Sequence, residues 1–204
     1  FALNLSAQHS GVFLGNNYSS NFNHLIYNEG SNYHTSFKPL IKSDIKFNID
    51  SILEQNSTNY SNWYLRKMFS EHFIILKGED YKVIASPVIN LSKGKEVNEG
   101  KNIFTNTRGF VVEGDLGKKI SFFSSFAENQ SIFPNYLDTY IRKNRVVPGQ
   151  GYARDFKETG FDYAMSSGYV TYRPNKIFAI QFGHGKNFIG DGYRSLLLSE
   201  NTFN

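Results

Sequence analysis

The chain of 204 residues contains no cysteine, which excludes disulfide bonds and thiolate metal sites. No segment approaches the roughly 18 consecutive apolar residues that a transmembrane helix needs. The net charge of +4 is not gathered into a block of Lys or Arg, and this argues against nucleic-acid binding. The first residue is Phe1 rather than Met, so we expect a mature N-terminus or the start of a fragment.

Recognisable catalytic motifs are also missing. There is no G-x-S-x-G elbow of a serine hydrolase, and the five His residues contain no i, i+4 pair for a metal. The glycine-rich stretch at residues 183–192 differs from a phosphate-binding loop, because Lys186 is followed by Asn187 rather than by Ser or Thr. Carboxylates such as Asp155 and Glu158 fit solvated loop charges better than a glycosidase pair. We therefore predict a non-enzymatic protein with no catalytic residues, no metal and no cofactor.

Aromatic residues are abundant, with 13 Tyr and 19 Phe in a sequence whose mean hydropathy is only -0.42. The aromatic girdles of a membrane barrel would use these residues, and so would the core of a soluble β protein. Hydropathy does not decide between the two, because a membrane barrel shows lipid only half of each strand.

The clearest pattern is the strand that opens the segment at residues 176–199. Its alternate side chains divide into an apolar set and a small or polar set. The first set is Phe178, Ile180 and Phe182, and the second is Ala179, Gln181 and Gly183. Small and polar residues suit a barrel interior, whereas a soluble sandwich would usually reverse the arrangement. We predict that the apolar set, together with Phe122 and Phe126, faces lipid.

Similar alternation predicts further strands at residues 81–92, 104–114, 120–127 and 161–173. The alternation is imperfect, since Phe123 falls on the polar parity, and Ile84 and Val88 blur the first of these strands. Asn106 and Arg108 fall on the apolar parity. For these two residues we expect a bulge, a strand end or a polar stretch above the hydrocarbon.

Short turns at residues 114–118 and 174–175 and a long loop at residues 129–160 are typical of outer-membrane barrels. The predicted fold is all-β, an antiparallel transmembrane β-barrel of which this chain forms an N-terminal part. Residues 1–79 would be an N-terminal extended segment with one short helix, and residues 80–204 the first strands of the barrel. Soluble sandwiches and lipocalin-like barrels show similar turns, so a soluble β-rich module stays open as an alternative.

The predicted strands are too few to close a membrane barrel. We count about five, whereas the smallest such barrels need about eight. An unpaired edge cannot sit in hydrocarbon, because its N–H and C=O groups would lack partners. We therefore expect the strand near Lys176 or the strand near Tyr81 to be an open edge, or to pair with another chain.

One helix is predicted at residues 61–73, with Ser61 as its N-cap. Its apolar stripe is spaced at i, i+3 and i+4 and consists of Leu65, Met68, Phe69, His72 and Phe73. We expect this stripe to pack against the β domain. His72 is then a boundary residue rather than a metal ligand.

Five motifs resemble the Wzi-like capsule-assembly outer-membrane proteins, and most closely their Bacteroidetes branch with the RemB-like gliding-motility proteins. The motifs are HTSFKPLI at residues 34–41, GEDYKVIASPVINLSKGKE at 78–96, NTRG at 106–109, ENQSIFPNY at 128–136 and GHGKNFIGDGYRSLLLSEN at 183–201. The resemblance implies a large barrel in the bacterial outer membrane with a role in capsule assembly or gliding motility. It also implies contact with outer-membrane lipid and lipopolysaccharide, with surface polysaccharide, and with other proteins of a motility or secretion complex. Proteins of this family are longer, so we expect this chain to be an N-terminal portion.

Two segments carry the candidate residues for binding a glycan, because aromatic rings stack on sugars and Arg or Lys can pair with uronic acids. These residues are Arg142, Lys143, Arg145, Tyr152, Arg154, Lys186, Asn187, Tyr193 and Arg194, with Tyr140 beside them. We expect the two segments to converge on one side of the barrel and to contact an acidic surface glycan. The alternative is that these charges brace neighbouring loops or face lipopolysaccharide phosphates. A soluble carbohydrate-binding or adhesion module is the second functional hypothesis.

Overall fold

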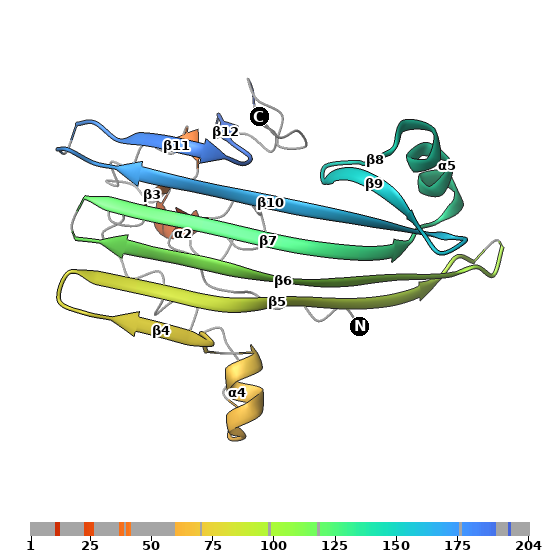
Figure 1. Ribbon diagram of the computed structural model, residues 1–204, viewed down its shortest axis with the longest axis horizontal. Helices are drawn as coiled ribbons and strands as arrows, with labels where there is room; N and C mark the ends of the chain where they lie inside the picture. Colours follow the sequence, from red (N-terminus) through yellow and green to blue (C-terminus); the bar gives the residue numbers. More distant parts are fainter. Residues whose placement is uncertain are drawn as a thin grey trace.

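The computed structural model describes residues 11–12, 23–26, 37–38, 40–41, 60–69, 71–97, 99–117, 119–175, 177–190 and 196. In these residues the chain forms mainly one β-sheet with three short helices (Figure 1). The strands of the sheet are β4 (Ile74–Lys77), β5 (Tyr81–Lys95), β6 (Asn102–Leu116), β7 (Ile120–Ile132), β8 (Val146–Val147), β9 (Gly151–Phe156), β10 (Gly160–Tyr172) and β11 (Ile180–His184). The helices are α2 (Asn23–Ile26), α4 (Trp63–Phe69) and α5 (Asn135–Asn144). Two further pairs join β1 (Gly11–Val12) to β3 (Leu40–Ile41) and β12 (Phe188–Ile189) to β2 (Phe37–Lys38).

The eight-stranded sheet has the order β4-β5-β6-β7-β10, and each neighbouring pair is antiparallel. The side of β10 that faces away from β7 is shared by two strands. It pairs with β9 near Gly160 and with β11 near Tyr172. The prediction of an all-β chain built from antiparallel strands is therefore confirmed.

Within the described residues the sheet is open on both sides: β4 pairs only with β5, and on the other side β11 pairs only with β10 and β8 only with β9. The expected open edge near Lys176 is present, although the strand starts at Ile180. The strand that begins at Tyr81 is not an edge, because β4 lies beyond it. A tight hairpin joins the two, in which the Gly78 amide donates to the Tyr81 carbonyl at 2.9 Å.

The two faces of the sheet differ in exposure. In β6, β7 and β10 the even-numbered residues are the more exposed ones, and in β5 the odd-numbered residues are the more exposed ones. We call the face that carries them the exposed face and the opposite one the shielded face. Apolar side chains gather on the exposed face, among them Pro87, Phe110, Phe126, Val170, Tyr172, Ile180 and Phe182. Phe122 lies on the same face but is half-buried, and Phe178 is exposed just before β11.

The shielded face is lined by hydroxyl and amide groups that bond to one another across strands. Thr107 donates to the Asn129 side-chain oxygen at 2.7 Å, and the hydroxyls of Ser125 and Ser167 are 2.7 Å apart. Phe123 also lies on this face, where its ring stacks on Tyr169 with centroids 5.2 Å apart. The aromatic contact explains why Phe123 departs from the polar parity.

Asn106 and Arg108 lie within an unbroken ladder, because β6 keeps continuous register with both β5 and β7. A bulge and a strand end are therefore excluded at these positions. Polar partners stand beside them on the exposed face: Gln130 opposite Asn106, and Glu128 opposite Arg108 with an ion pair of 3.4 Å. The third expectation, a polar stretch of the strand, is the one that the structure supports.

The predicted helix is shorter than expected and its cap is different. α4 covers seven residues, and Asn62 rather than Ser61 caps it, since the Asn62 side chain accepts from the Tyr64 amide at 2.9 Å. Leu65 and Phe73 are exposed, so they do not pack against the sheet as expected. The helix ends before His72, whose ring lies 3.5 Å from the Ser86 hydroxyl on the shielded face as the chain turns into β4.

The segment at residues 129–160 is not one long loop, as expected, but contains the end of β7, α5, β8 and β9. These elements lie at the end of the sheet where β5 meets β6 (Figure 1). The opposite end carries short turns between β4 and β5 and between β6 and β7. We call these the long-loop end and the short-turn end. A hydrophobic core lies at the long-loop end and consists of Ile141, Val147, Ala153, Phe161 and Tyr163, with Phe133 and Leu137 packed against it.

Candidate functional site

Helix α5 is anchored to the sheet by its apolar side. Ile141 is fully buried in the core, where Phe161 and Tyr163 of β10 lie beside it. Both β10 residues are odd-numbered and pair with Ser131 and Asn129 of β7, so they belong to the shielded face. The helix therefore folds over the shielded face of the sheet.

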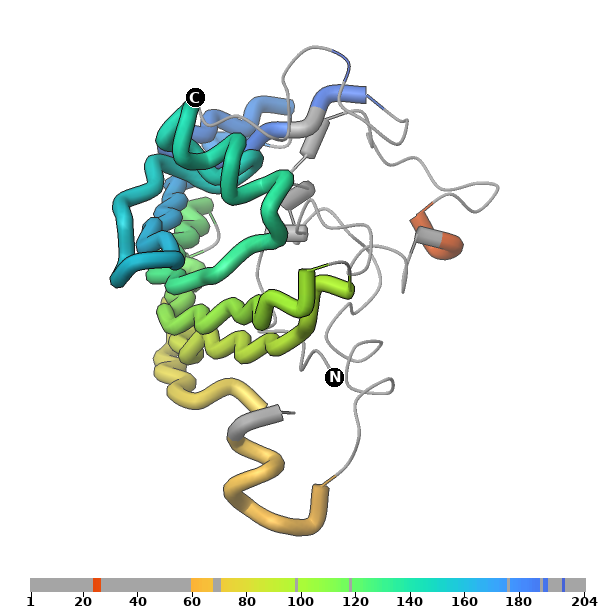
Figure 2. The backbone as a smooth tube through the Cα atoms, turned by 90° about the vertical axis from the view of Figure 1, so that its right-hand side faces the viewer, coloured from red at the N-terminus to blue at the C-terminus, as the bar shows by residue number. Residues whose placement is uncertain are grey.

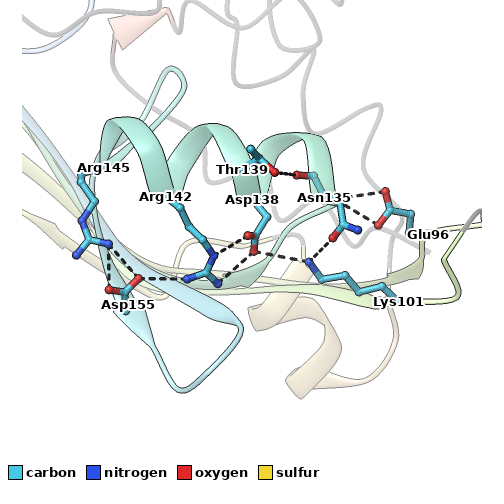
Figure 3. Close-up of polar contacts among 8 residues, drawn as sticks. All are labelled: Glu96, Lys101, Asn135, Asp138, Thr139, Arg142, Arg145 and Asp155. Atoms are coloured by element: carbon cyan, nitrogen blue, oxygen red, sulfur yellow. Dashed lines mark hydrogen bonds and ion pairs between the residues drawn. The ribbon is translucent and has the colours of Figure 1, made fainter.

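A chain of polar contacts fixes the start of α5 to the turn between β5 and β6 (Figure 3). The Asn135 amide donates to the Glu96 carboxylate at 3.3 Å. Lys101 donates to the Asn135 side-chain oxygen at 2.9 Å and lies 3.6 Å from Asp138. The free N–H at the helix start thus finds a carboxylate, which also suits the helix dipole.

The same chain continues along α5 to β9 (Figure 3). Arg142 Nε donates to Asp138 at 2.7 Å, one helical turn back, and another of its nitrogens lies 3.7 Å from Asp155. Arg145 binds Asp155 with two contacts of 3.0 and 3.1 Å. The hydrogen bond and charge of Asp155 raise the pKa of Arg145 above its ordinary value. Two of the predicted glycan-binding cations are therefore neutralised by carboxylates of this chain.

All five of the predicted residues from Arg142 to Arg154 have exposed side chains, and Lys143, Tyr152 and Arg154 are the three that have no ion pair with a carboxylate in the described part of the chain. Arg154 pairs in register with Asp162, on the exposed face, whereas its neighbour Asp155 pairs with Phe161, on the shielded face. Arg154 thus lies on the opposite face of β9 from Asp155, which binds Arg142 and Arg145, so the predicted cations do not form a single patch.

The second predicted segment meets the first at one contact. Lys186 Nζ donates to the Gly149 carbonyl at 2.7 Å, which brings the turn after β11 against the turn before β9. Asn187 is half-buried next to it. Tyr193 and Arg194 lie outside the described residues.

Several residues of the site were not singled out from the sequence. Tyr136 is 72% exposed, one helical turn before the half-exposed Tyr140, so two tyrosine rings lie on one side of α5. The carboxylates Glu96, Asp138 and Asp155 were missed as partners of the cations. Only Asp138 could have been found, because it stands four residues before Arg142 in a helical segment that begins after a proline.

Among the described residues no group of three or more His, Asp or Glu side chains is placed to hold a metal ion. No helix in this part of the chain is both long and apolar enough to cross a membrane. Neither the family models, nor the curated proteins, nor the solved structures yield a match to this chain.

Proposed function

We propose that this chain is part of the wall of an outer-membrane β-barrel that serves surface polysaccharide assembly or attachment and has no enzymatic activity. The observation that carries the proposal is the chemistry of the two faces of the sheet. Large apolar side chains cover the exposed face, whereas the shielded one carries hydrogen-bonded Ser, Thr and Asn side chains between buried apolar ones such as Ile84 and Val111. In water, each Å² of apolar surface on the exposed face would lack about 25 cal/mol of the stabilising free energy that burial provides. Lipid removes this penalty, and a wet barrel interior suits the polar face.

The extent of the apolar band supports the same proposal. On β5 it runs from Tyr81 to Leu91, ten residue steps or about 34 Å along the strand. At a strand tilt of about 40° this gives a height of roughly 26 Å, close to the ~25 Å apolar band of outer-membrane barrels. On β6 and β7 the band ends at Phe110 and Phe126, which lie opposite each other and nearer the short-turn end than Leu91. On β10 it ends at Val170, which lies nearer still to the short-turn end. Tilted strands require such an oblique boundary.

The lengths of the connections give the orientation. Outer-membrane barrels have short turns on the periplasmic side and long loops on the outside. The short-turn end would therefore face the periplasm, and α5, β8 and β9 would face the exterior. The ion pair of Arg108 with Glu128 would lie just above the hydrocarbon.

The exterior end is the proposed site of contact with an acidic glycan. Tyr136, Tyr140 and Tyr152 offer exposed rings for stacking, and Lys143 and Arg154 offer exposed cations. Arg142 and Arg145 would act mainly by holding α5 and β9 in place, since each binds a carboxylate. Lys186 would hold the neighbouring turn.

The motifs that resemble Wzi-like and RemB-like proteins support the same location. They also leave gliding motility as a role for the barrel. In that role the exterior end would contact a protein of the motility or secretion complex. Binding of purified capsule to cells would separate the two roles.

Single cysteines can test the membrane location directly, because the chain has none of its own. Phe126→Cys lies on the exposed face, and Ser125→Cys, its neighbour, lies on the shielded face. Each would carry a small fluorophore in protein reconstituted into vesicles. Lipids with a quencher on the acyl chain should quench the probe at position 126 strongly and the probe at position 125 weakly. Equal quenching at both positions, or protein that stays in the aqueous phase after detergent partition, would contradict the proposal.

A further inference from the structure

The position of α5 has a consequence for the interior of the proposed barrel. In a closed barrel the shielded face of the sheet lines the lumen, because the exposed face meets lipid. The core places Ile141 of α5 against Phe161 and Tyr163, which are shielded-face residues at the long-loop end. Figure 2 looks along the strands from this end, and α5 leans to one side of the sheet together with the turn between β5 and β6. The helix thus lies across the mouth of the lumen and not outside the wall.

Two sets of contacts hold the helix in that position, and a third holds the hairpin that follows it. Its first turn is fixed to the β5–β6 turn through Lys101 and Asp138. Its last turn is fixed to β9 through Asp155, which binds two arginines. The β8–β9 hairpin that follows is fixed from the other side, where Lys186 bonds to the Gly149 carbonyl. The helix and its hairpin are thus tied to the β5–β6 turn, to β9 and to the turn after β11.

We infer that α5, with the β8–β9 hairpin, is a resident cap that closes the exterior mouth of the barrel to large solutes. The inference rests on the proposed membrane location. A ten-residue helix is about 15 Å long and about 10 Å wide, so it obstructs a substantial area at the mouth. Below the cap the lumen wall carries Ser125, Ser167 and Thr107, which water can solvate. The cap rather than the wall would then decide what passes.

Size-selective labelling tests the cap in the intact protein. Ser125→Cys places a thiol on the lumen wall beneath the cap, and Glu158→Cys places one on the exposed turn between β9 and β10. Intact cells would be treated from outside with a small thiol reagent or with a maleimide on a 5 kDa polyethylene glycol. Both reagents should label Glu158→Cys, and only the small reagent should label Ser125→Cys at a comparable rate.

A second variant removes the cap by replacing residues 135–144 with a short Gly-Ser linker. In Ser125→Cys protein this change should raise the rate of labelling by the large reagent at least tenfold. Equal labelling of both cysteines by the large reagent in the capped protein would overturn the inference. So would failure of the small reagent at Ser125→Cys, since the shielded face would then be no lumen. If the shortened protein fails to insert into the membrane, the inference is tested by the capped protein alone, through the labelling of Ser125→Cys and Glu158→Cys by the two reagents. Failure of both reagents at Glu158→Cys would instead count against the proposed location and orientation.

Discussion

Asp155 lies between two guanidinium groups, and this arrangement decides which cations around α5 can meet a ligand. Arg142 and Arg145 both contact its carboxylate, while Lys143, between them in sequence, is exposed and has no carboxylate partner within the described residues. A ligand would compete with Asp155 for Arg145, and with both Asp138 and Asp155 for Arg142. Lys143 has no such competitor among the described carboxylates.

The pairing predicts that Lys143 contributes to glycan binding, whereas an exposed lysine at the opposite end of the sheet does not. Lys143→Ala should weaken binding of an acidic glycan about two- to fivefold at low salt, since an exposed charge contact contributes roughly 0.5–1 kcal/mol. The effect should largely disappear above about 0.5 M salt, because exposed charges are screened. Lys119→Ala, at the short-turn end, is the matched control and should leave binding unchanged. Titration of purified capsule at two salt concentrations measures both, and equal losses for the two variants would refute the assignment.

Gly109 lies in the middle of β6, where there is no space for a side chain. A Cβ on Gly109 would meet the Phe126 carbonyl oxygen and would lie 2.8 Å from the Ala127 Cα, and neither backbone atom can move aside easily. Gly109→Ala should therefore lower the free energy of unfolding by about 1–3 kcal/mol. The measurement is the urea midpoint in detergent micelles.

Gly168 is the matched control for that substitution. It also lies within a long strand, but the nearest atom to its Cβ would be the Phe123 carbonyl oxygen at 3.4 Å, an ordinary contact. Gly168→Ala should change the free energy of unfolding by less than about 0.5 kcal/mol. If both substitutions had the same effect, strand propensity rather than crowding would be the cause.

At the scale of single elements, α4 depends on one carboxylate that follows it. A helix of seven residues is not stable by itself in water. Glu71 binds both Arg66 and Lys67, the latter at 2.9 Å, and its amide also donates to the Arg66 carbonyl at 2.9 Å. The hydrogen bond from Lys67, followed by the contribution of Arg66, lowers the pKa of Glu71 below its ordinary value of about 4.5.

A lowered pKa makes the stability of α4 depend on pH in a defined direction. The contribution of Glu71 is fully present above about pH 4.5 and is lost as the pH falls through its lower folded value. Trp63, the single tryptophan of the chain, lies in α4, so its fluorescence should change in that acidic range. Glu71→Gln should show the acid spectrum at neutral pH and no transition. A transition that persists in Glu71→Gln would assign the change to another group.

The strands could be predicted from the sequence to different degrees, for physical reasons. Period-two alternation survives in β5, β6, β7, β10 and β11, because each of these strands separates an apolar face from a polar one. β4 has no such signal, since the run from Phe73 to Leu76 is apolar at every position and fits a helix or a strand equally. The helix α5 was missed inside a presumed loop. Its anchors, Phe161 and Asp155, lie far along the chain, so the sequence around the helix does not show what stabilises it.

The proximity of the two segments of the candidate site could be predicted from the sequence, but the ion pairs within the site could not. Sequence reasoning placed Arg142 to Arg154 near Lys186, and the bond of Lys186 to Gly149 joins the two segments. It did not show that Arg142 and Arg145 are neutralised, because Asp155 is brought to them only by the β8–β9 hairpin. It also could not show that Arg154 turns to the opposite face, which follows from its register with Asp162.

At the scale of the whole molecule, the two open edges of the sheet constrain how it can be closed. Adjacent strands are antiparallel along the path β4-β5-β6-β7-β10-β11, so β4 and β11 run in opposite directions. An antiparallel barrel then needs an even number of further strands between them. Six strands of this path are present, and the smallest membrane barrels have about eight, so at least two more strands must lie between the edges.

A pair of cysteines tests this closure. Leu76 of β4 and Phe182 of β11 lie in one cross-strand row, which passes through Val83, Gly114, Phe122 and Val170. Two strands between the edges would put these residues about 14 Å apart, beyond the ~7 Å that a disulfide can span. Because tilted strands shift the register where a barrel closes, Leu76→Cys would be combined in turn with a cysteine at each residue from Ile180 to His184, and no such pair should form an intramolecular disulfide in the membrane under a mild oxidant. Val170→Cys with Phe182→Cys, which pair directly in register, should form one readily and serve as the control. A fast intramolecular disulfide in any of the pairs with Leu76→Cys would mean that β4 meets β11 directly, and the sheet would then be a small closed barrel with no place for further strands.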